Sequence, residues 1–230
     1  MARNEYQQQL EALRAAVVEM SELVCDRFRR ALRALEEGDE ELADAVVTGD
    51  HEINDLYLEL EQECIDLLAL QQPVAGDLRF IAASFKIITD LERIADLATN
   101  LGAYARRIDR DRDRDWDRDR HRYPNIDVTH IGIQTIEMVE EAMRAYESDD
   151  AARTRSIDAM DDDVDALCER AGEAVVRDLI ERERNLDDGI LEDVSRTLLT
   201  IRDIERVGDH AVNIAARTLY MVENDDELIY

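Results

Sequence analysis

The sequence predicts an all-α fold made of two tandem three-helix bundles that are related by an internal duplication. Helix-forming residues dominate the composition, and 230 residues include only 8 glycines and 2 prolines, so few positions interrupt a helix. Apolar residues recur every three or four positions along most of the chain, which is the spacing of an amphipathic helix. One short acidic pattern also occurs twice, about half a chain apart, which indicates a repeated structural unit.

Composition limits the environment and the partners. A hydrophobic fraction of 45% is sufficient for packed cores despite a net charge of −28. Lys86 is the single lysine among 28 basic residues, which is typical of proteins from salt-accumulating halophiles; an acidic protein from a GC-rich genome is the alternative. The charge disfavours nucleic acid and anionic membrane surfaces as partners. No signal peptide follows Met1 and no run approaches the roughly 20 apolar residues of a membrane span, so we expect a cytoplasmic protein without membrane insertion.

The first half, residues 1–107, is expected to form three antiparallel helices. An amphipathic helix covers residues 6–35 and ends at Gly38. Asp39 can cap a second helix that runs through residue 70. Pro73 suits the first turn of a third helix, which fades near residues 104–107.

The second half, residues 127–230, repeats this plan. Asp39 and Asp150 match at nearly the same offset as the two acidic patterns, so the helices of the two halves can be aligned one by one. Between the halves lies an Arg/Asp-rich tract, 108–126, which we predict to be a linker; a salt-bridged helix extension is the alternative. The helices expected in the second half cover residues 127–146, 149–183 and 187–222.

The repeated acidic pattern reads Asp-Leu-Glu-Arg-Ile-Ala-Asp at residues 90–96 and Asp-Ile-Glu-Arg-Val-Gly-Asp at residues 203–209. An asparagine follows each copy, so Glu, Asp and Asn stand at i, i+4 and i+8. This spacing places the three side chains along one edge of a helix, beside its apolar face. The six residues are Glu92, Asp96 and Asn100 in the first copy and Glu205, Asp209 and Asn213 in the second.

The preceding helix of each half carries a second polar pair at i, i+4. These pairs are Asp50 with Asn54 and Asp161 with Asp165. If neighbouring helices bring the two stripes together, their carboxylates require a cation, and oxygen ligands suit Mg, Ca, Mn, Fe or sometimes Zn. The alternative is a set of solvated surface acids, although acids at i, i+4 repel each other by a few tenths of a kcal/mol.

Several other sites are disfavoured. His51 and His210 each follow a stripe acid, face another side of the helix, and are expected to have a surface or partner role. No histidine has a glutamate three residues before it, which argues against a ferritin-type di-iron centre. The chain also lacks a phosphate-binding Gly-rich loop, a nucleophile elbow and a Cys-x-x-Cys pair. We therefore expect no catalytic residues and no enzymatic activity.

Residues 71–79, Gln-Gln-Pro-Val-Ala-Gly-Asp-Leu-Arg, followed by Leu-Glu-Arg-Ile-Ala-Asp at 91–96, resemble the first half of the PhoU family of phosphate-uptake regulators. Residues 204–215 resemble the second signature of that family. The resemblance covers nearly the whole chain. It implies two three-helix bundles with pseudo-twofold symmetry and negative regulation of high-affinity phosphate import.

The resemblance also implies multinuclear iron or zinc clusters on the bundle surface. By position these would use Asp50, Glu92 and Asp96 in one site and Asp161, Asp165, Glu205 and Asp209 in the other. Asn54 stands where the second half has Asp165, so the first site is expected to bind more weakly. Ala95 stands where the second half has Gly208.

The partners implied by the resemblance are the ATPase subunit of a phosphate ABC transporter and, in bacteria, a phosphate-sensing histidine kinase. We also expect a homodimer. Two alternatives stay open: a metal-dependent enzyme built on a carboxylate helical bundle, and a metal-free helical scaffold whose acids serve solubility in salt.

Overall fold

The structure is a computed structural model that describes residues 2–71, 73–110, 127–181 and 188–228. Within these ranges the chain is all-helical, which confirms the predicted fold class. The helices are α1 (Ala2–Glu37), α2 (Glu40–Thr48), α3 (Asp50–Gln71), α4 (Ala75–Arg110), α6 (Val128–Ser148), α7 (Ala151–Glu181) and α8 (Asp188–Glu223).

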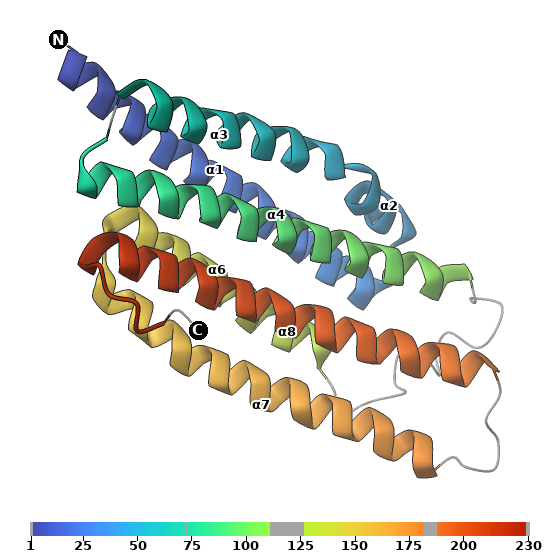
Figure 1. Cartoon of the computed structure of the whole chain (residues 1–230). Coiled ribbons are helices and arrows are strands. Elements are labelled where there is room, and N and C mark those ends of the chain that lie inside the picture. The colour runs from blue at the N-terminus through green and yellow to red at the C-terminus, as the bar shows by residue number, and fades with distance from the viewer. Residues whose placement is uncertain (1, 72, 111–126, 182–187, 229–230) are drawn as a thin grey trace.

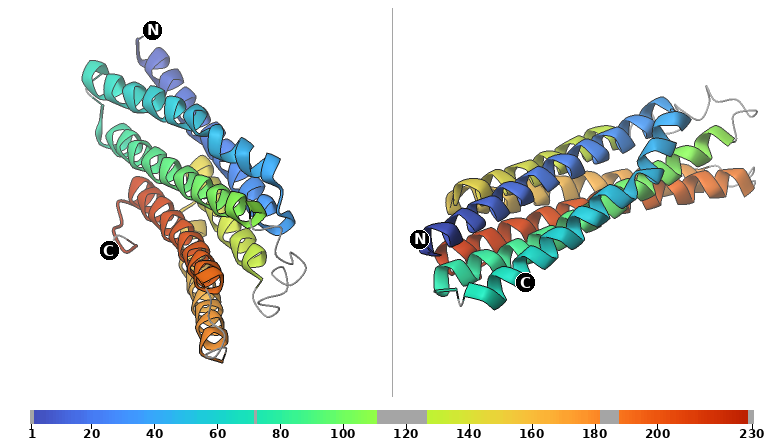
Figure 2. Two further views of the ribbon diagram at one scale, coloured as in Figure 1. Left: turned by 90° about the vertical axis from the view of Figure 1, so that its right-hand side faces the viewer. Right: turned by 90° about the horizontal axis from the view of Figure 1, so that it is seen from above.

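The long helices lie side by side in an elongated bundle, as Figures 1 and 2 show. Helices α1 to α4 form the first half and α6 to α8 the second. The halves meet where α4 packs on α8 and α1 packs on α6. A single hydrophobic cluster extends through both halves, joining residues such as Phe28 and Leu91 to Val139 and Ile204. The two repeats therefore share one continuous core.

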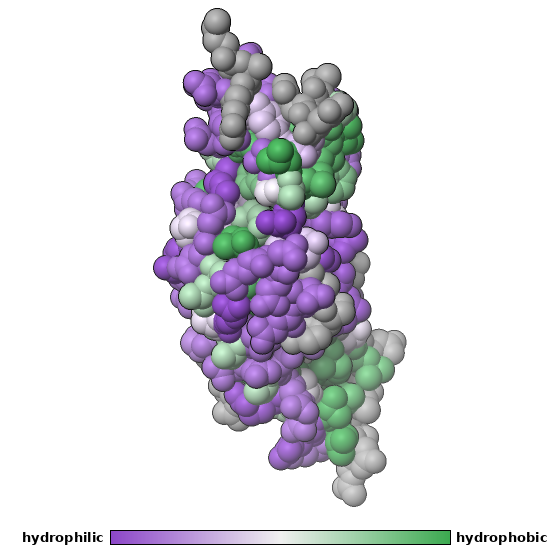
Figure 3. All heavy atoms as spheres, turned by 60° about the vertical axis from the view of Figure 1, so that its left-hand side comes forward, coloured by the Kyte–Doolittle hydropathy of each residue, from purple (hydrophilic) through white to green (hydrophobic). Residues whose placement is uncertain are grey.

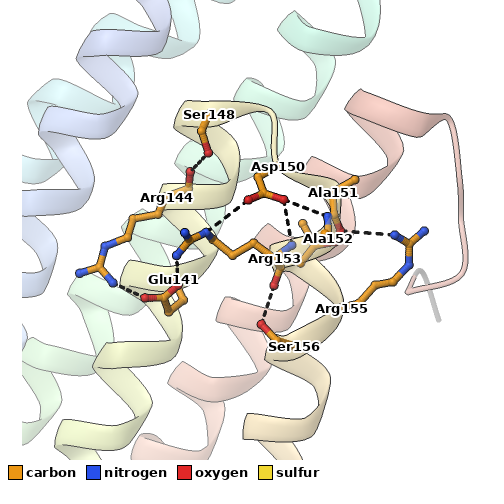
Figure 4. A network of polar contacts seen from close by, with 10 residues as sticks. Glu141, Arg144, Ser148, Asp150, Ala151, Ala152, Arg153, Arg155 and Ser156 are labelled. Atoms are coloured by element: carbon orange, nitrogen blue, oxygen red, sulfur yellow. Dashed lines mark hydrogen bonds and ion pairs between the residues drawn. The ribbon is translucent and has the colours of Figure 1, made fainter.

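The duplication extends to the turns between helices. Gly38 and Asp149 occupy equivalent positions in the two halves, and both adopt the left-handed conformation, with φ of 63° and 53°. Asp39 then accepts a hydrogen bond from the Leu42 amide at 3.0 Å, as a helix cap does. In the second half, Asp150 Oδ1 accepts from two amides of the first turn of α7, each at 3.1 Å (Figure 4).

The second predicted helix of the first half was wrong in one respect, because the structure divides residues 39–70 into α2 and α3. The break lies at Gly49, whereas α7 is unbroken at the equivalent place. Buried Arg27 donates a hydrogen bond to the Val46 carbonyl at the end of α2. A Cβ at Gly49 would lie 3.1 Å from the Ala45 oxygen and 3.4 Å from Arg27 Nη1, so the guanidinium and the break leave little room for a side chain.

The predicted linker is only partly covered by the structure. Helix α4 continues to Arg110, beyond the fading predicted at residues 104–107. The rest of the Arg/Asp tract, 111–126, lies outside the described residues, so the linker and the domain boundaries stay predictions.

The surface is mainly hydrophilic on the face that Figure 3 shows, with separate apolar patches. Large exposed apolar side chains on the outer helices include Leu58, Ile65 and Leu68 on α3 and Val176 and Ile180 on α7. Across the described ranges, no helix combines the length and the apolar composition that a membrane crossing requires.

Candidate carboxylate metal sites

The structure places the two sets of predicted ligands on neighbouring helices. Helix α3, with Asp50 and Asn54, packs against α4, with Glu92 and Asp96; we call this set the first site. Helix α7 likewise packs against α8. The second site comprises Asp161, Asp165, Glu205 and Asp209.

In the first site, groups of the protein itself bind Asp50. Its Oδ1 lies 3.4 Å from Arg27 Nη2 and accepts a hydrogen bond from the Thr99 hydroxyl at 3.1 Å. Its Oδ2 accepts from the Asn54 amide at 3.1 Å. Both carboxylate oxygens therefore have partners, and one partner carries a positive charge.

In the second site, Asp161 has no comparable partner. Its Oδ1 is buried and makes no hydrogen bond. Burial, followed by the charges of Asp165 and Asp209, raises the pKa of Asp161 from 3.8 to about 6. A Cβ at Gly208 would lie 3.0 Å from that oxygen, so the carboxylate rests against the α8 backbone and would have to shift if a side chain stood there.

Four other acids of the two sites have a raised pKa, and burial is the main cause for each. Burial raises the pKa of Asp165 and of Glu205, and Asp209 raises both further. Burial likewise raises the pKa of Asp96, with a smaller increase from Asp50 and a decrease from Arg27. Burial and then Asp96 raise the pKa of Glu92. A nearby cation stabilises the charged form of such carboxyl groups.

Neither site is assembled in advance. Over the part of the chain that the structure describes, no group of three or more His, Cys, Asp or Glu side chains is arranged so that it could hold a metal ion. Binding would require the carboxylates to draw together.

The two asparagines of the stripes contact residues on the seam between α4 and α8. The Asn100 amide lies 3.4 Å from Asp203 Oδ2, and the Asn213 amide lies 3.5 Å from Asp90 Oδ1. Each asparagine thus reaches an acid of the other half. Both acids are buried, and the pairing repeats across the pseudo-twofold axis.

His210 also belongs to this seam, so the surface alternative of the predicted surface or partner role was wrong. The side chain is buried, and its Nδ1 lies 2.9 Å from Asp90 Oδ1. The helix face that points away from the acidic stripe packs against the other half rather than facing solvent. His51, in contrast, is exposed.

Arg27 and Thr99, which bind Asp50, were not among the residues predicted from the sequence. One signal was present: Arg27 lies on the apolar side of its helix, next to Phe28 and among Val17, Met20, Val24 and Ala31. An arginine on the buried face of a helix indicates an internal acidic partner.

The architecture and the acidic repeats can be compared with known proteins. The model of the PhoU domain matches this chain twice, over residues 17–105 and 128–218. The chain belongs to the PhoU family. The two matches coincide with the two halves described above, so each structural repeat of this PhoU-family chain is one PhoU domain.

Relatives of known name agree with this membership. A Pseudomonas putida protein, "Phosphate-specific transport system accessory protein PhoU homolog", is 32% identical over 96% of this chain and 82% of its own length. A Methanothermobacter thermautotrophicus protein of the same description, homolog 1, is 32% identical over 94% of both chains. These are names of accessory proteins, in agreement with the prediction that the PhoU-family chain is not an enzyme.

Solved structures match the fold. The crystal structure of PhoU from Pseudomonas aeruginosa has a TM-score of 0.84 and 32% identity, covering 96% of this chain and all of the other. The phosphate transport system regulatory protein PhoU from Streptococcus pneumoniae has a TM-score of 0.81 at 22% identity, covering 96% and 98%. The second match concerns the fold alone.

Proposed function

We propose that the chain is an accessory protein of a phosphate transport system and restrains phosphate uptake through contact with the ATPase subunit of the transporter. The main support is the pair of PhoU domains that together span almost the whole described fold. The relatives from Pseudomonas putida and Methanothermobacter thermautotrophicus are named as accessory proteins of phosphate transport, and this supports the proposed role.

The surface carries exposed apolar side chains that a protein partner can contact. Ile65 on α3 and Val176 on α7 are both exposed and occupy equivalent positions, so the two halves present an apolar side chain at matching places. Apolar groups surrounded by charged residues are common at protein interfaces. In a bacterium, a phosphate-sensing histidine kinase is a further partner in this proposal, and we propose that the chain acts as a homodimer.

The proposal includes cation binding by the acids. The support for a divalent cation at the second site is the buried Asp161 carboxylate oxygen, which lacks a partner there and packs against the backbone at Gly208. Asp161, Asp165, Glu205 and Asp209 would hold the ion, with iron or zinc as the proposed metal of a multinuclear cluster. The ion would supply the positive charge that this group of acids lacks.

The first site fits such a cation less well. Asp50, Asn54, Glu92 and Asp96 would be the ligands, but Arg27 already contacts Asp50. If neither site takes up metal, the protein is a metal-free helical scaffold.

The transport proposal can be tested by capture. The tagged chain is incubated with a purified phosphate-transporter ATPase subunit at high salt, with and without phosphate, and the bound fraction is measured. We expect capture that depends on phosphate concentration. A substitution pair, Ile65→Glu with Val176→Glu, should reduce it, whereas the exposed polar pair Gln62→Glu with Glu173→Gln serves as the control.

The same proteins can be examined in cells that lack their own PhoU-family protein. We expect the wild-type chain to lower the uptake of labelled phosphate when phosphate is abundant. An unchanged uptake rate, together with no capture of the ATPase subunit, would contradict the proposed function.

A further inference from the structure

We infer that Arg27 is a built-in counter-ion of the first site, so that only the second site takes up an external divalent cation. This inference rests on the cation binding proposed above and concerns which half of the molecule performs it.

Arg27 is an integral part of the first site. The residue is 7% exposed and projects from the apolar face of α1. Its Nη2 donates to the Val46 carbonyl at the end of α2 and lies 3.3 Å from Thr99 Oγ1 and 3.4 Å from Asp50 Oδ1. One guanidinium thus joins four helices, because Thr99 belongs to α4 and Asp50 to α3. A charge held from three sides stays in place, unlike a surface arginine.

The second half lacks every group that serves Asp50. Helices α1 to α3 align with α6 and α7 when the turn at Gly38 is matched to the turn at Asp149. Helix α4 aligns with α8 when the two acidic patterns are matched. The first-half partners are Arg27, Asn54 and Thr99. Their counterparts in the second half are Met138, Asp165 and Val212.

These replacements change the chemistry at Asp161. Neither a methionine nor a valine donates a strong hydrogen bond, and the aspartate adds a negative charge. Met138 is fully buried, and its Cε lies 3.8 Å from the position of a Cβ at Gly208, the same position that lies 3.0 Å from Asp161 Oδ1. Met138 therefore stands at the sequence position that matches Arg27 and packs near the same Gly208 backbone as Asp161.

The second site is consequently short of positive charge. The charged groups with the largest effect on Asp161 are Asp165, Asp209, Asp158 and Asp162, all of them acids. A buried carboxylate oxygen without a partner costs free energy that a bound cation would recover. In the first site Arg27 already stabilises the buried carboxylate. A divalent ion would have to displace the guanidinium or bind against its repulsion.

The helix break between α2 and α3 has the same cause, which is the presence of Arg27 in the first half and of Met138 in the second. The Val46 carbonyl accepts a hydrogen bond from Arg27, and the chain breaks at Gly49 three residues later. In the second half Met138 cannot donate, and α7 continues through the equivalent position. A side chain inserted into the hydrogen bonds of a helix is a known cause of such breaks.

The inference can be tested by counting Mn²⁺, because the electron paramagnetic resonance signal of free Mn²⁺ reports how much the protein binds. Two matched charge-neutralising pairs are compared with the wild-type chain: Asp165→Asn with Asp209→Asn, and Glu92→Gln with Asp96→Asn. We expect the first pair to weaken Mn²⁺ binding at least tenfold and the second to change it less than twofold. Equal losses in both pairs would overturn the inference.

A gain of binding provides the second measurement. Arg27→Met gives the first half the residue of the second, and we expect additional bound Mn²⁺ that is lost again when Glu92→Gln and Asp96→Asn are added. A folded Arg27→Met variant with the Mn²⁺ count of the wild type would contradict us.

Removing Arg27 leaves Asp50 without its charged partner and lowers stability. Circular dichroism melting therefore precedes the count, and if Arg27→Met does not fold, the two acid pairs decide. If no variant and no wild-type protein binds Mn²⁺, the cation binding and this inference fall together. The capture of the ATPase subunit is measured separately and is unaffected by that result.

Discussion

Nδ1 of His210 lies 2.9 Å from Oδ1 of Asp90, and this contact joins the two halves of the molecule across the α4–α8 seam. Both side chains are buried, and Asn213 reaches the same carboxylate oxygen. The acid at the equivalent place of the second half, Asp203, is bound instead by Asn100, by the Tyr104 hydroxyl at 2.9 Å and by Arg202 Nη2 at 2.8 Å. The seam is therefore pseudosymmetric in its acids and asparagines but not in the other groups that bind the acids.

Replacing His210 by alanine should destabilise the protein by about 2 kcal/mol, because the buried Asp90 carboxylate loses a hydrogen bond that water does not replace. The free energy of unfolding from urea titration measures the loss. His130→Ala, at an exposed position of α6, is the control and should change stability by less than about 0.5 kcal/mol. Equal effects of the two substitutions would show that the seam contact contributes nothing.

Asp161 should make stability depend on pH. The folded-state pKa is raised to about 6 from 3.8, so the carboxyl favours folding when protonated. This contribution is complete below about pH 3.8 and is lost as the pH rises through 6. Asp161→Asn avoids the loss, and without divalent ions it should be more stable than the wild type at pH 7, by about 1 kcal/mol after solvent screening.

The measurement is the difference in unfolding free energy between the two proteins from pH 4 to pH 7.5. We expect this difference to grow with pH and to vanish near pH 4. Asp163→Asn, an exposed substitution on the same helix, should give a small difference that does not change with pH. A constant difference for Asp161→Asn would refute the assignment of the shift to this carboxyl.

Gly132 should tolerate no side chain. A Cβ at this position of α6 would lie 2.5 Å from Leu32 Cδ2 of α1, where the halves make their second contact. Leu32 is almost fully buried and cannot swing away freely. Gly132→Ala is expected to cost about 1–3 kcal/mol through overpacking, measured by urea unfolding.

A matched glycine gives the contrast. Around Gly172, in α7, nothing lies within 4 Å of an added Cβ. Gly172→Ala should therefore stabilise the helix by about 0.5–1 kcal/mol. Leu32→Ala combined with Gly132→Ala should cost less than the sum of the two single changes. If the losses from the two single changes simply add, the strain in Gly132→Ala does not come from contact with Leu32.

Salt should stabilise this chain. A net charge of −28 on 230 residues repels itself, and that repulsion is screened as ionic strength rises. Raising KCl from about 0.1 to 1 M, where the Debye length falls to about 3 Å, should increase the melting temperature by several degrees. NaCl should act equally if screening is the cause. A melting temperature that is unchanged or falls would show that self-repulsion is unimportant.

The sequence by itself determined most of the helices, the duplication and the placement of the acids beside the core, but not the break between α2 and α3. These features are local: apolar spacing sets the buried face of a helix, and the same spacing places Glu92 and Asp96 on its flank. The family signatures at residues 91–96 and 204–215 are local as well, and for that reason they could be read before any tertiary contact was known.

Only the tertiary structure decided which side chains meet. Asn100, Asn213 and His210 are polar, and their helical positions alone do not tell whether solvent or another helix faces them. The packing of α4 on α8 made them partners of buried acids. In the same way, Arg27 lies on the apolar side of its helix, and the crossing of α1 over α3 and α4 made Asp50 its partner. Pairing between distant segments depends on how helices cross, and periodicity along one helix does not contain that information.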